Sequence, residues 1–174
     1  MGTASQMNIE ENMMLATRRT KKKTLKWGFN KEDREACVNK LKSLNLGLEN
    51  RLEQKVGLLS GGQRQAVTLL MATIQRPDIL LLDEHTAALD PKTAKVVLEL
   101  TSKIVEEEKI TTLMITHNMR DAIKYGNRLI MLNEGRVIFD ISGEEKKNLT
   151  VEHLLEMFEK ASGSEINNDR MLLG

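Results

Sequence analysis

The feature of this sequence that most constrains its fold is a short apolar run that ends abruptly in two acids. Residues 79–82 read Ile-Leu-Leu-Leu, and Asp83 and Glu84 follow directly. A wholly apolar run of this length is typical of a parallel-sheet strand that is covered on both faces. Acids at the carboxyl end of such a strand lie where open α/β sheets bind ligands. The pattern predicts an α/β fold with a candidate site at this strand end.

The rest of the chain predicts a helical lobe followed by alternating strands and helices. The expected helices cover residues 8–19, 31–44, 61–75, 91–108, 118–125 and 151–159, and the other expected strands cover 111–116, 128–132 and 136–141. Asn8 and Glu11 have the spacing of a capping pair, and Asn30, Asp90 and Thr150 precede three other helices as N-caps. We therefore expect a helical domain over 1–58, an α/β domain over 59–159 and a loose tail over 160–174.

Composition limits the classes of function. Apolar residues make up 40% of the 174 residues and charged residues 29%, which is ordinary for a globular protein. The net charge of +1 and the five aromatic residues give no reason to expect a nucleic-acid partner. The single cysteine, Cys37, cannot form an internal disulfide, and its helical spacing with Leu41 predicts a core residue.

Membrane signals are weak. No apolar stretch reaches the roughly 20 residues that a membrane span needs, so any role at a membrane is expected to be exerted from outside the lipid. Residues 1–6 also lack the pattern of a signal peptide. The basic run at residues 18–23 is typical of a solvated helix end; the alternative is a contact with a membrane protein or with anionic head groups, close to Trp27.

A second candidate site segment is the glycine-rich sequence of residues 59–65, Leu-Ser-Gly-Gly-Gln-Arg-Gln, which opens a helix. Glycines let the backbone approach a ligand closely, and a helix N-terminus favours an anion such as phosphate. Most isolated Ser-Gly-Gly sequences are only turns, so this segment indicates a phosphate site only together with the motifs that follow it.

The chemistry of the acidic pair and of one histidine fits phosphate ligands. Asp83 and Glu84 leave the strand in different directions, so one could hold Mg²⁺ and the other could face the water that attacks phosphorus; the alternative is a pair of helix-capping acids. His117 follows the expected strand 111–116 and could reach a terminal phosphate or orient the water, whereas a lone histidine there is usually structural. His85 and His153 have no such setting, and no ligand spacing suggests zinc or iron.

Together these segments resemble the ATP-binding cassette ATPases. Residues 59–65 look like the signature motif, 79–84 like Walker B, 87–90 like the D-loop and His117 like the switch histidine. Across roughly residues 1–158 the sequence is similar to those of a bacterial subgroup of tryptophan/tyrosine importer ATPases. His85 stands where many relatives have proline.

The resemblance implies a P-loop NTPase-like (RecA-like) domain that acts as a head-to-tail dimer at the cytoplasmic face of a membrane. ATP would lie between the Walker A of one domain and the signature of the other. Within this chain Asp83 would serve Mg²⁺, Glu84 would act as general base or position the water, and His117 would sense the γ-phosphate. Ser60, Gly61, Gly62 and Gln63 would contact the partner's ATP, Asp90 would connect the two sites, and residues 8–58 would dock on a permease.

One departure from the family is an absence. No Walker A sequence G-x-x-x-x-G-K-[ST] occurs in the 174 residues, and residues 1–5 resemble the stretch that follows the Q-loop glutamine. We therefore expect the carboxyl-terminal part of an ATPase domain, through truncation, an internal start or a cloned fragment, and no ATP hydrolysis by this chain alone. Besides an importer ATPase, the sequence leaves open a soluble ABC-type ATPase and a non-enzymatic chain that lends its signature to a partner.

Overall fold

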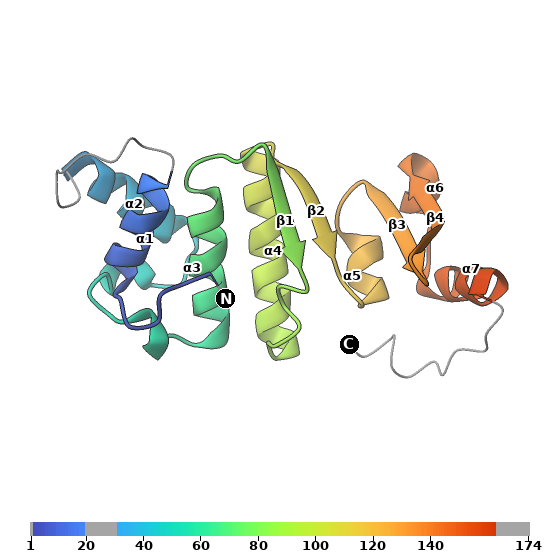
Figure 1. The fold of residues 1–174 in the computed structure, drawn as a ribbon, viewed down its shortest axis with the longest axis horizontal. Coiled ribbons are helices and arrows are strands. Elements are labelled where there is room, and N and C mark those ends of the chain that lie inside the picture. Colours follow the sequence, from blue (N-terminus) through green and yellow to red (C-terminus); the bar gives the residue numbers. More distant parts are fainter. Residues whose placement is uncertain (1, 20–30, 163–174) are drawn as a thin grey trace. The chain divides into compact units, whose positions relative to one another are not determined.

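The computed structural model describes residues 2–19 and 31–162 (Figure 1). Contacts divide the chain into two compact units, residues 1–113 and 114–174, and each unit is described by itself. The expected boundary between a helical and an α/β domain at residues 58 and 59 stays a prediction. In the described part of the chain, no helix is long and apolar enough to cross a membrane.

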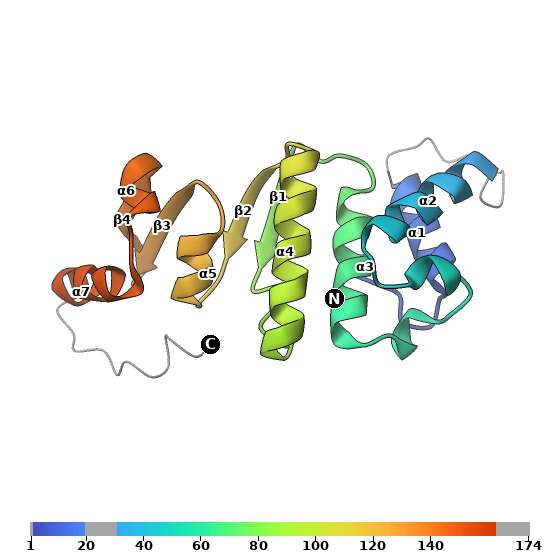
Figure 2. The ribbon, with the colours of Figure 1, turned by 180° about the vertical axis from the view of Figure 1, so that it is seen from behind.

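The first unit begins with a group of three packed helices. Helix α1 covers Ile9–Arg18, α2 covers Lys31–Ser43, and α3 covers Gly61–Thr73. Two short 3₁₀ turns, η1 at Leu48–Asn50 and η2 at Val56–Leu58, lie between α2 and α3. Helix α3 packs against both α1 and α2, as both ribbon views show (Figures 1 and 2).

The predicted start of α1 is confirmed in detail. Asn8 Oδ1 accepts a hydrogen bond from the Glu11 backbone N–H at 2.8 Å, and Glu11 Oε2 accepts one from the Asn8 N–H at 2.8 Å. This reciprocal pair satisfies two of the amide groups that a helix N-terminus leaves free. The local capping pair thus marks where α1 begins, and the Ile9 and Glu10 N–H groups donate to the distant carbonyls of Gln54 and Leu52, both at 3.1 Å.

The expected burial of Cys37 is confirmed. Cys37 and Leu41 of α2 are 1% and 0% exposed, and Leu44 and Leu48, which follow the end of α2, are also at most 5% exposed. The expected cap Asn30, the basic residues 20–23 and Trp27 lie outside the described residues.

A strand–helix–strand segment follows α3, and its second strand runs across the boundary at residue 113. Strand β1 covers Ile79–Asp83, α4 covers Pro91–Glu107, and β2 covers Thr111–Ile115; β1 and β2 are neighbours in a two-stranded sheet. Figure 2 shows α4 lying across one face of this sheet. Leu80 and Leu82, on β1, are buried.

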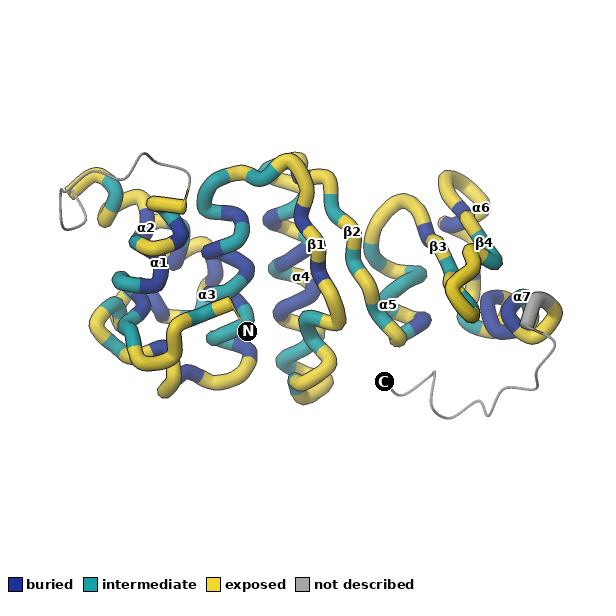
Figure 3. Tube along the Cα trace, viewed as in Figure 1, coloured by how far each residue is buried: buried dark blue, intermediate teal, exposed yellow. Residues whose placement is uncertain are grey.

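The prediction that this strand is covered on both faces is wrong for the described part of the chain. Ile79 and Leu81 are 54% and 66% exposed, and Leu113 of β2 is 51% exposed. Successive side chains of a strand point to opposite faces, so one covering helix buries only every second residue. The alternation of buried and exposed positions along β1 is visible in Figure 3.

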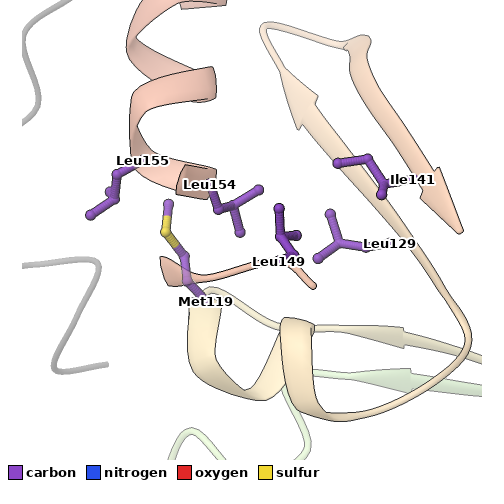
Figure 4. Packing of buried hydrophobic residues seen from close by; sticks show 6 residues of the cluster. All are labelled: Met119, Leu129, Ile141, Leu149, Leu154 and Leu155. Atoms are coloured by element: carbon purple, nitrogen blue, oxygen red, sulfur yellow. The ribbon is translucent and has the colours of Figure 1, made fainter. Parts of the chain in front are cut away.

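The second unit is built around a hairpin. Strand β3 (Arg128–Asn133) pairs antiparallel with β4 (Arg136–Ser142), and Glu134 and Gly135 both have the positive φ of a tight hairpin turn. The unit also contains three helices, α5 (Met119–Lys124), α6 (Gly143–Lys147) and α7 (Val151–Ser162). Six apolar side chains form the core shown in Figure 4: Met119, Leu129, Ile141, Leu149, Leu154 and Leu155.

The sequence predicts most of this unit. Thr150 Oγ1 accepts a hydrogen bond from the His153 N–H at 3.2 Å, as expected of an N-cap of α7. Helix α7 ends at Ser162 and not at residue 159, and the remainder of the expected tail lies outside the described residues. Helix α6 is not predicted, because its sequence of glycine, acids and lysines has no apolar periodicity.

Candidate functional site

The glycine-rich segment forms the capped N-terminus of α3. Ser60 is the N-cap: its Oγ accepts from the Gln63 N–H at 3.3 Å, and Gln63 Oε1 accepts from the Ser60 N–H at 3.2 Å. The sequence Ser-Gly-Gly-Gln is therefore a capping box, with the two glycines in the first helical turn. The capping box takes up the Ser60 and Gln63 amides. The amides of Gly61 and Gly62 have no acceptor within the helix, and the helix dipole adds positive potential there, so the turn suits an anion.

Asp90 is the N-cap of α4, as predicted. Its Oδ1 accepts a hydrogen bond from the Thr93 N–H at 3.0 Å, and Pro91 occupies the first helical turn. Hydrogen bonds from the side chain and the backbone of Thr93 hold the pKa of the Asp90 carboxyl below its ordinary range. Asp90 thus carries a negative charge at neutral pH in an exposed position on the loop that follows β1.

The structure brings these two segments together. A Cβ atom placed on Gly61 would lie 3.0 Å from Leu89 Cδ2, and one placed on Gly62 would lie less than 3.0 Å from Thr93 Cγ2. Helices α3 and α4 pack against each other along this line. The absence of side chains at both glycines therefore lets α3 approach the Asp90 turn closely, a contact that the sequence did not reveal.

The two acids at the end of β1 are exposed and differ in backbone conformation. Asp83 is the last residue of the strand, and Glu84 follows with φ +40°. A positive φ is uncommon for a residue other than glycine, and such strained residues are concentrated at functional sites. The roles proposed for the two acids stay predictions.

His85 anchors the segment that follows Glu84. Its Nε2 lies 3.2 Å from Thr101 Oγ1, and the Thr101 hydroxyl donates to the Val97 carbonyl at 2.8 Å. Because that hydroxyl has only one hydrogen, its oxygen must accept from His85, so Nε2 carries the imidazole proton. Burial lowers the pKa of His85, which favours the neutral ring. These contacts give His85 a structural role.

His117 belongs to the second unit. It follows β2 by two residues and lies between two anchored neighbours. Thr116 Oγ1 accepts from the Asn118 N–H at 3.1 Å, and Asn118 Oδ1 accepts from the Asp121 N–H at 3.2 Å as the cap of α5. The expected position of His117 beside Asp83 and Glu84 stays a prediction.

The donor set suits Mg²⁺ shared with a phosphate ligand. In the residues described, no three His, Cys, Asp or Glu side chains form a group that could hold a metal by themselves. Mg²⁺ is usually held by one or two carboxylates together with phosphate oxygens and water. Asp83, exposed at the strand end, can supply such a carboxylate.

The fold is that of the ABC ATPase domains. One similar solved structure is an inward-facing conformation of an ABC transporter; it has a TM-score of 0.72 and 25% identity, and the match covers 91% of this chain and 61% of that chain. Another is a dimeric, post-hydrolysis ATP-binding cassette bound to ADP and Pi, with a TM-score of 0.63 and 29% identity over 80% of this chain and 58% of that chain. The predicted P-loop NTPase-like fold class is confirmed.

The chain belongs to the ABC transporter family, whose model matches residues 2–87. It is 49% identical to a tyrosine transport ATP-binding protein of Clostridioides difficile, over 92% of this chain and 64% of that protein. It is 35% identical to a zinc uptake system ATP-binding protein of Listeria innocua, over 83% of this chain and 55% of that protein. It is 37% identical to a methionine import ATP-binding protein of Streptococcus pneumoniae, over 77% of this chain and 36% of that protein. The chain thus spans less than two thirds of these relatives.

Proposed function

We propose that this chain is part of the ATP-binding subunit of an importer, in which ATP hydrolysis drives uptake of a solute such as an amino acid. The observation that carries the proposal is the packing of the capped Ser60–Gln63 turn on the Asp90 turn, in a unit whose strand β1 ends in Asp83 and Glu84. An amino-acid solute is supported by the relatives named for tyrosine transport and methionine import.

Each site residue has a role that its chemistry supports. The Ser60–Gln63 turn would bind phosphate oxygens of a nucleotide held by a second ATPase domain, through the Gly61 and Gly62 amides at a helix N-terminus. Glu84 would accept the proton of the attacking water, and His117 would donate a hydrogen bond to the terminal phosphate. Asp83 would hold Mg²⁺, which offsets the phosphate charge when bound. Asp90, beside the Ser60–Gln63 turn, would link the two nucleotide sites of the dimer.

The permease partner is proposed to bind the helical lobe. A groove of about 510 Å³ lies along α2; its lining combines basic, acidic and apolar residues, namely Lys31, Arg34, Glu35, Val38, Asn39, Lys42 and Leu52. Such a mixed groove suits a short amphipathic segment of another protein. Docking here would place the subunit at the cytoplasmic face of the membrane.

The test joins residues 2–162 to the amino-terminal segment of the Clostridioides difficile relative, so that the joined chain contains a Walker A sequence. We expect the joined chain to release phosphate from ATP in the presence of Mg²⁺. The Glu84→Gln variant of the joined chain should release none while it still binds ATP. Because a site that binds without hydrolysing should accumulate the ATP-bridged state, Glu84→Gln should elute as a dimer in size-exclusion chromatography with ATP.

Two controls separate the proposed roles. In the Glu84→Gln chain, adding Ser60→Arg should prevent the dimer, because the arginine fills the space proposed for the phosphates of the partner's nucleotide. The 174-residue chain alone should show no phosphate release above background. A joined Glu84→Gln chain that binds ATP but stays monomeric, or a Ser60→Arg chain that still dimerises, would refute the assignment of the base and of the nucleotide-facing turn.

A further inference from the structure

One side chain, Thr93, contacts both of the segments that form the candidate site of the first unit. It stands in the first turn of α4, three residues after the cap Asp90, and is partly buried. Its Cγ2 methyl lies over Gly62 of α3, at a position that leaves no room for a Cβ on that glycine. Its backbone N–H donates to Asp90 Oδ1 at 3.0 Å.

The backbone and the side chain of Thr93 make different kinds of contact. The backbone N–H donates to the Asp90 carboxylate, and the Cγ2 methyl meets Gly62. Thr93 is β-branched, which restricts χ1 and keeps the methyl directed at Gly62. A residue without this methyl would keep the bond to Asp90 but lose the contact with Gly62.

We propose that Thr93 is a positioning residue that joins the Asp90 turn to the Ser60–Gln63 turn, so that both turns keep one fixed relative geometry. The methyl fills the notch over Gly62, and the backbone amide holds the Asp90 carboxylate. Its consequence for nucleotide binding rests on the proposed function, in which both turns face the nucleotide of a partner domain. The packing itself does not depend on that function.

The packing is tested by a size swap in the 174-residue chain. Gly62→Ala should lower the melting temperature by roughly 4–10 °C, because the new Cβ overlaps the Thr93 methyl in a packed contact. Adding Thr93→Ser removes that methyl, and the next neighbours of the new Cβ are then Thr93 Cβ at 3.6 Å and Val97 Cγ2 at 3.9 Å, which are ordinary contacts. The double variant should therefore recover at least half of the loss. Equal melting temperatures for Gly62→Ala and the double variant would overturn the proposed contact.

The positioning role is tested with Thr93→Ser, which removes the methyl and keeps the hydroxyl, and with Thr93→Val, which keeps the methyl and the volume. Backbone amide NMR spectra of the 174-residue chain should show shifted signals for residues 60–63 in Thr93→Ser, and signals close to those of the parent in Thr93→Val. Unshifted signals in Thr93→Ser would overturn the proposal.

The effect on nucleotide binding is measured in the joined chain carrying Glu84→Gln. Thr93→Ser should raise the ATP concentration at half-maximal dimer formation about fivefold or more, while Thr93→Val, which keeps the methyl, should leave it unchanged. If the Glu84→Gln parent does not dimerise, the proposed function fails. If the parent dimerises and Thr93→Ser does so at the same ATP concentration, the positioning role fails.

Discussion

Cys37 is one of the most completely buried residues of α2, with 1% of its surface exposed. Burial, with a smaller contribution from the Glu10 carboxylate, raises the pKa of its thiol to about 11. The thiolate is the reactive form of cysteine, so the folded chain holds Cys37 in its unreactive state at neutral pH. The expected role as a small core residue agrees with this environment.

The raised pKa of Cys37 predicts a loss of stability in base. In the unfolded chain the thiol loses its proton near its ordinary pKa of 9.0, whereas the folded chain keeps it to about pH 11. The folded chain therefore binds the thiol proton more tightly than the unfolded chain does. As a result, the free energy of unfolding falls as pH rises from 9 toward 11, and below pH 9 this group has no effect. The expected loss between pH 8 and 10.5 is about 2 kcal/mol, at roughly 1.4 kcal/mol per pH unit above 9.

Urea denaturation of the parent and of Cys37→Ala at the two pH values measures this loss. The variant lacks the thiol, so its free energy of unfolding should fall less over the same range. Other groups that titrate in base affect both chains equally. Parallel curves for the two chains would show that the thiol ionises alike in the folded and unfolded states.

At the scale of the element, the end of α5 depends on a buried lysine. Lys146 of α6 is 5% exposed, and its Nζ donates to the backbone carbonyls of Ile123 at 2.5 Å and Tyr125 at 3.2 Å. These carbonyls lie at the carboxyl end of α5, where a helix leaves its acceptors unsatisfied and where a positive charge is favoured. The ammonium thus ties α6 to α5 within the second unit.

Lys146→Met is expected to destabilise the chain by about 1–3 kcal/mol, because it keeps the aliphatic stem but leaves two carbonyl groups without their donor. Its neighbour provides a matched control: the Lys147 side chain is 70% exposed and forms a surface ion pair with Glu144. Lys147→Met should change the free energy of unfolding by less than about 1 kcal/mol. Chemical denaturation of both variants measures the difference, and equal losses would contradict the capping role.

The same elements show what the sequence could and could not predict. The starts of α1 and α4 were predictable because Asn8, Glu11 and Asp90 act within one helical turn. Helix α6 was not, because the burial of Lys146 depends on carbonyls more than 20 residues away in the sequence. Local pattern reveals which residues can cap or form a helix, but not which distant element covers them.

The candidate site also combines features that local sequence predicts with features that depend on distant packing. Local sequence patterns selected seven of the site residues, and the elements that carry them begin where expected, although α3 ends at Thr73 and not at residue 75. The seven are Ser60, Gly61, Gly62, Gln63, Asp83, Glu84 and Asp90. The positive φ of Glu84 and the contact of Thr93 with Gly62 were not predictable, because both depend on tertiary packing. The spacing of Asp90 and Thr93, cap and third helical residue, is a local signal that could have drawn attention to Thr93.

At the scale of the whole molecule, the structure exposes large apolar side chains on β1 and β2. Leu81 is 66% exposed, and Ile79 and Leu113 are each more than half exposed. A sheet face of this kind is a site of association, because its burial removes apolar surface from water. The 174-residue chain should therefore associate as its concentration rises.

Leu81→Lys is expected to reduce this association, because a charged side chain on an exposed strand opposes burial of the face against another molecule. Leu81 already points away from α4, so the change should affect the free energy of unfolding little. Val96→Lys is the matched control: Val96 is an exposed apolar residue of α4, 45% exposed and outside the sheet face, and receives the same charge. Light scattering over a concentration series measures the mean mass of each chain. The parent and Val96→Lys should gain mass together while Leu81→Lys stays near 19.7 kDa; a parent that remains monomeric at the highest concentration would show that this face does not drive association.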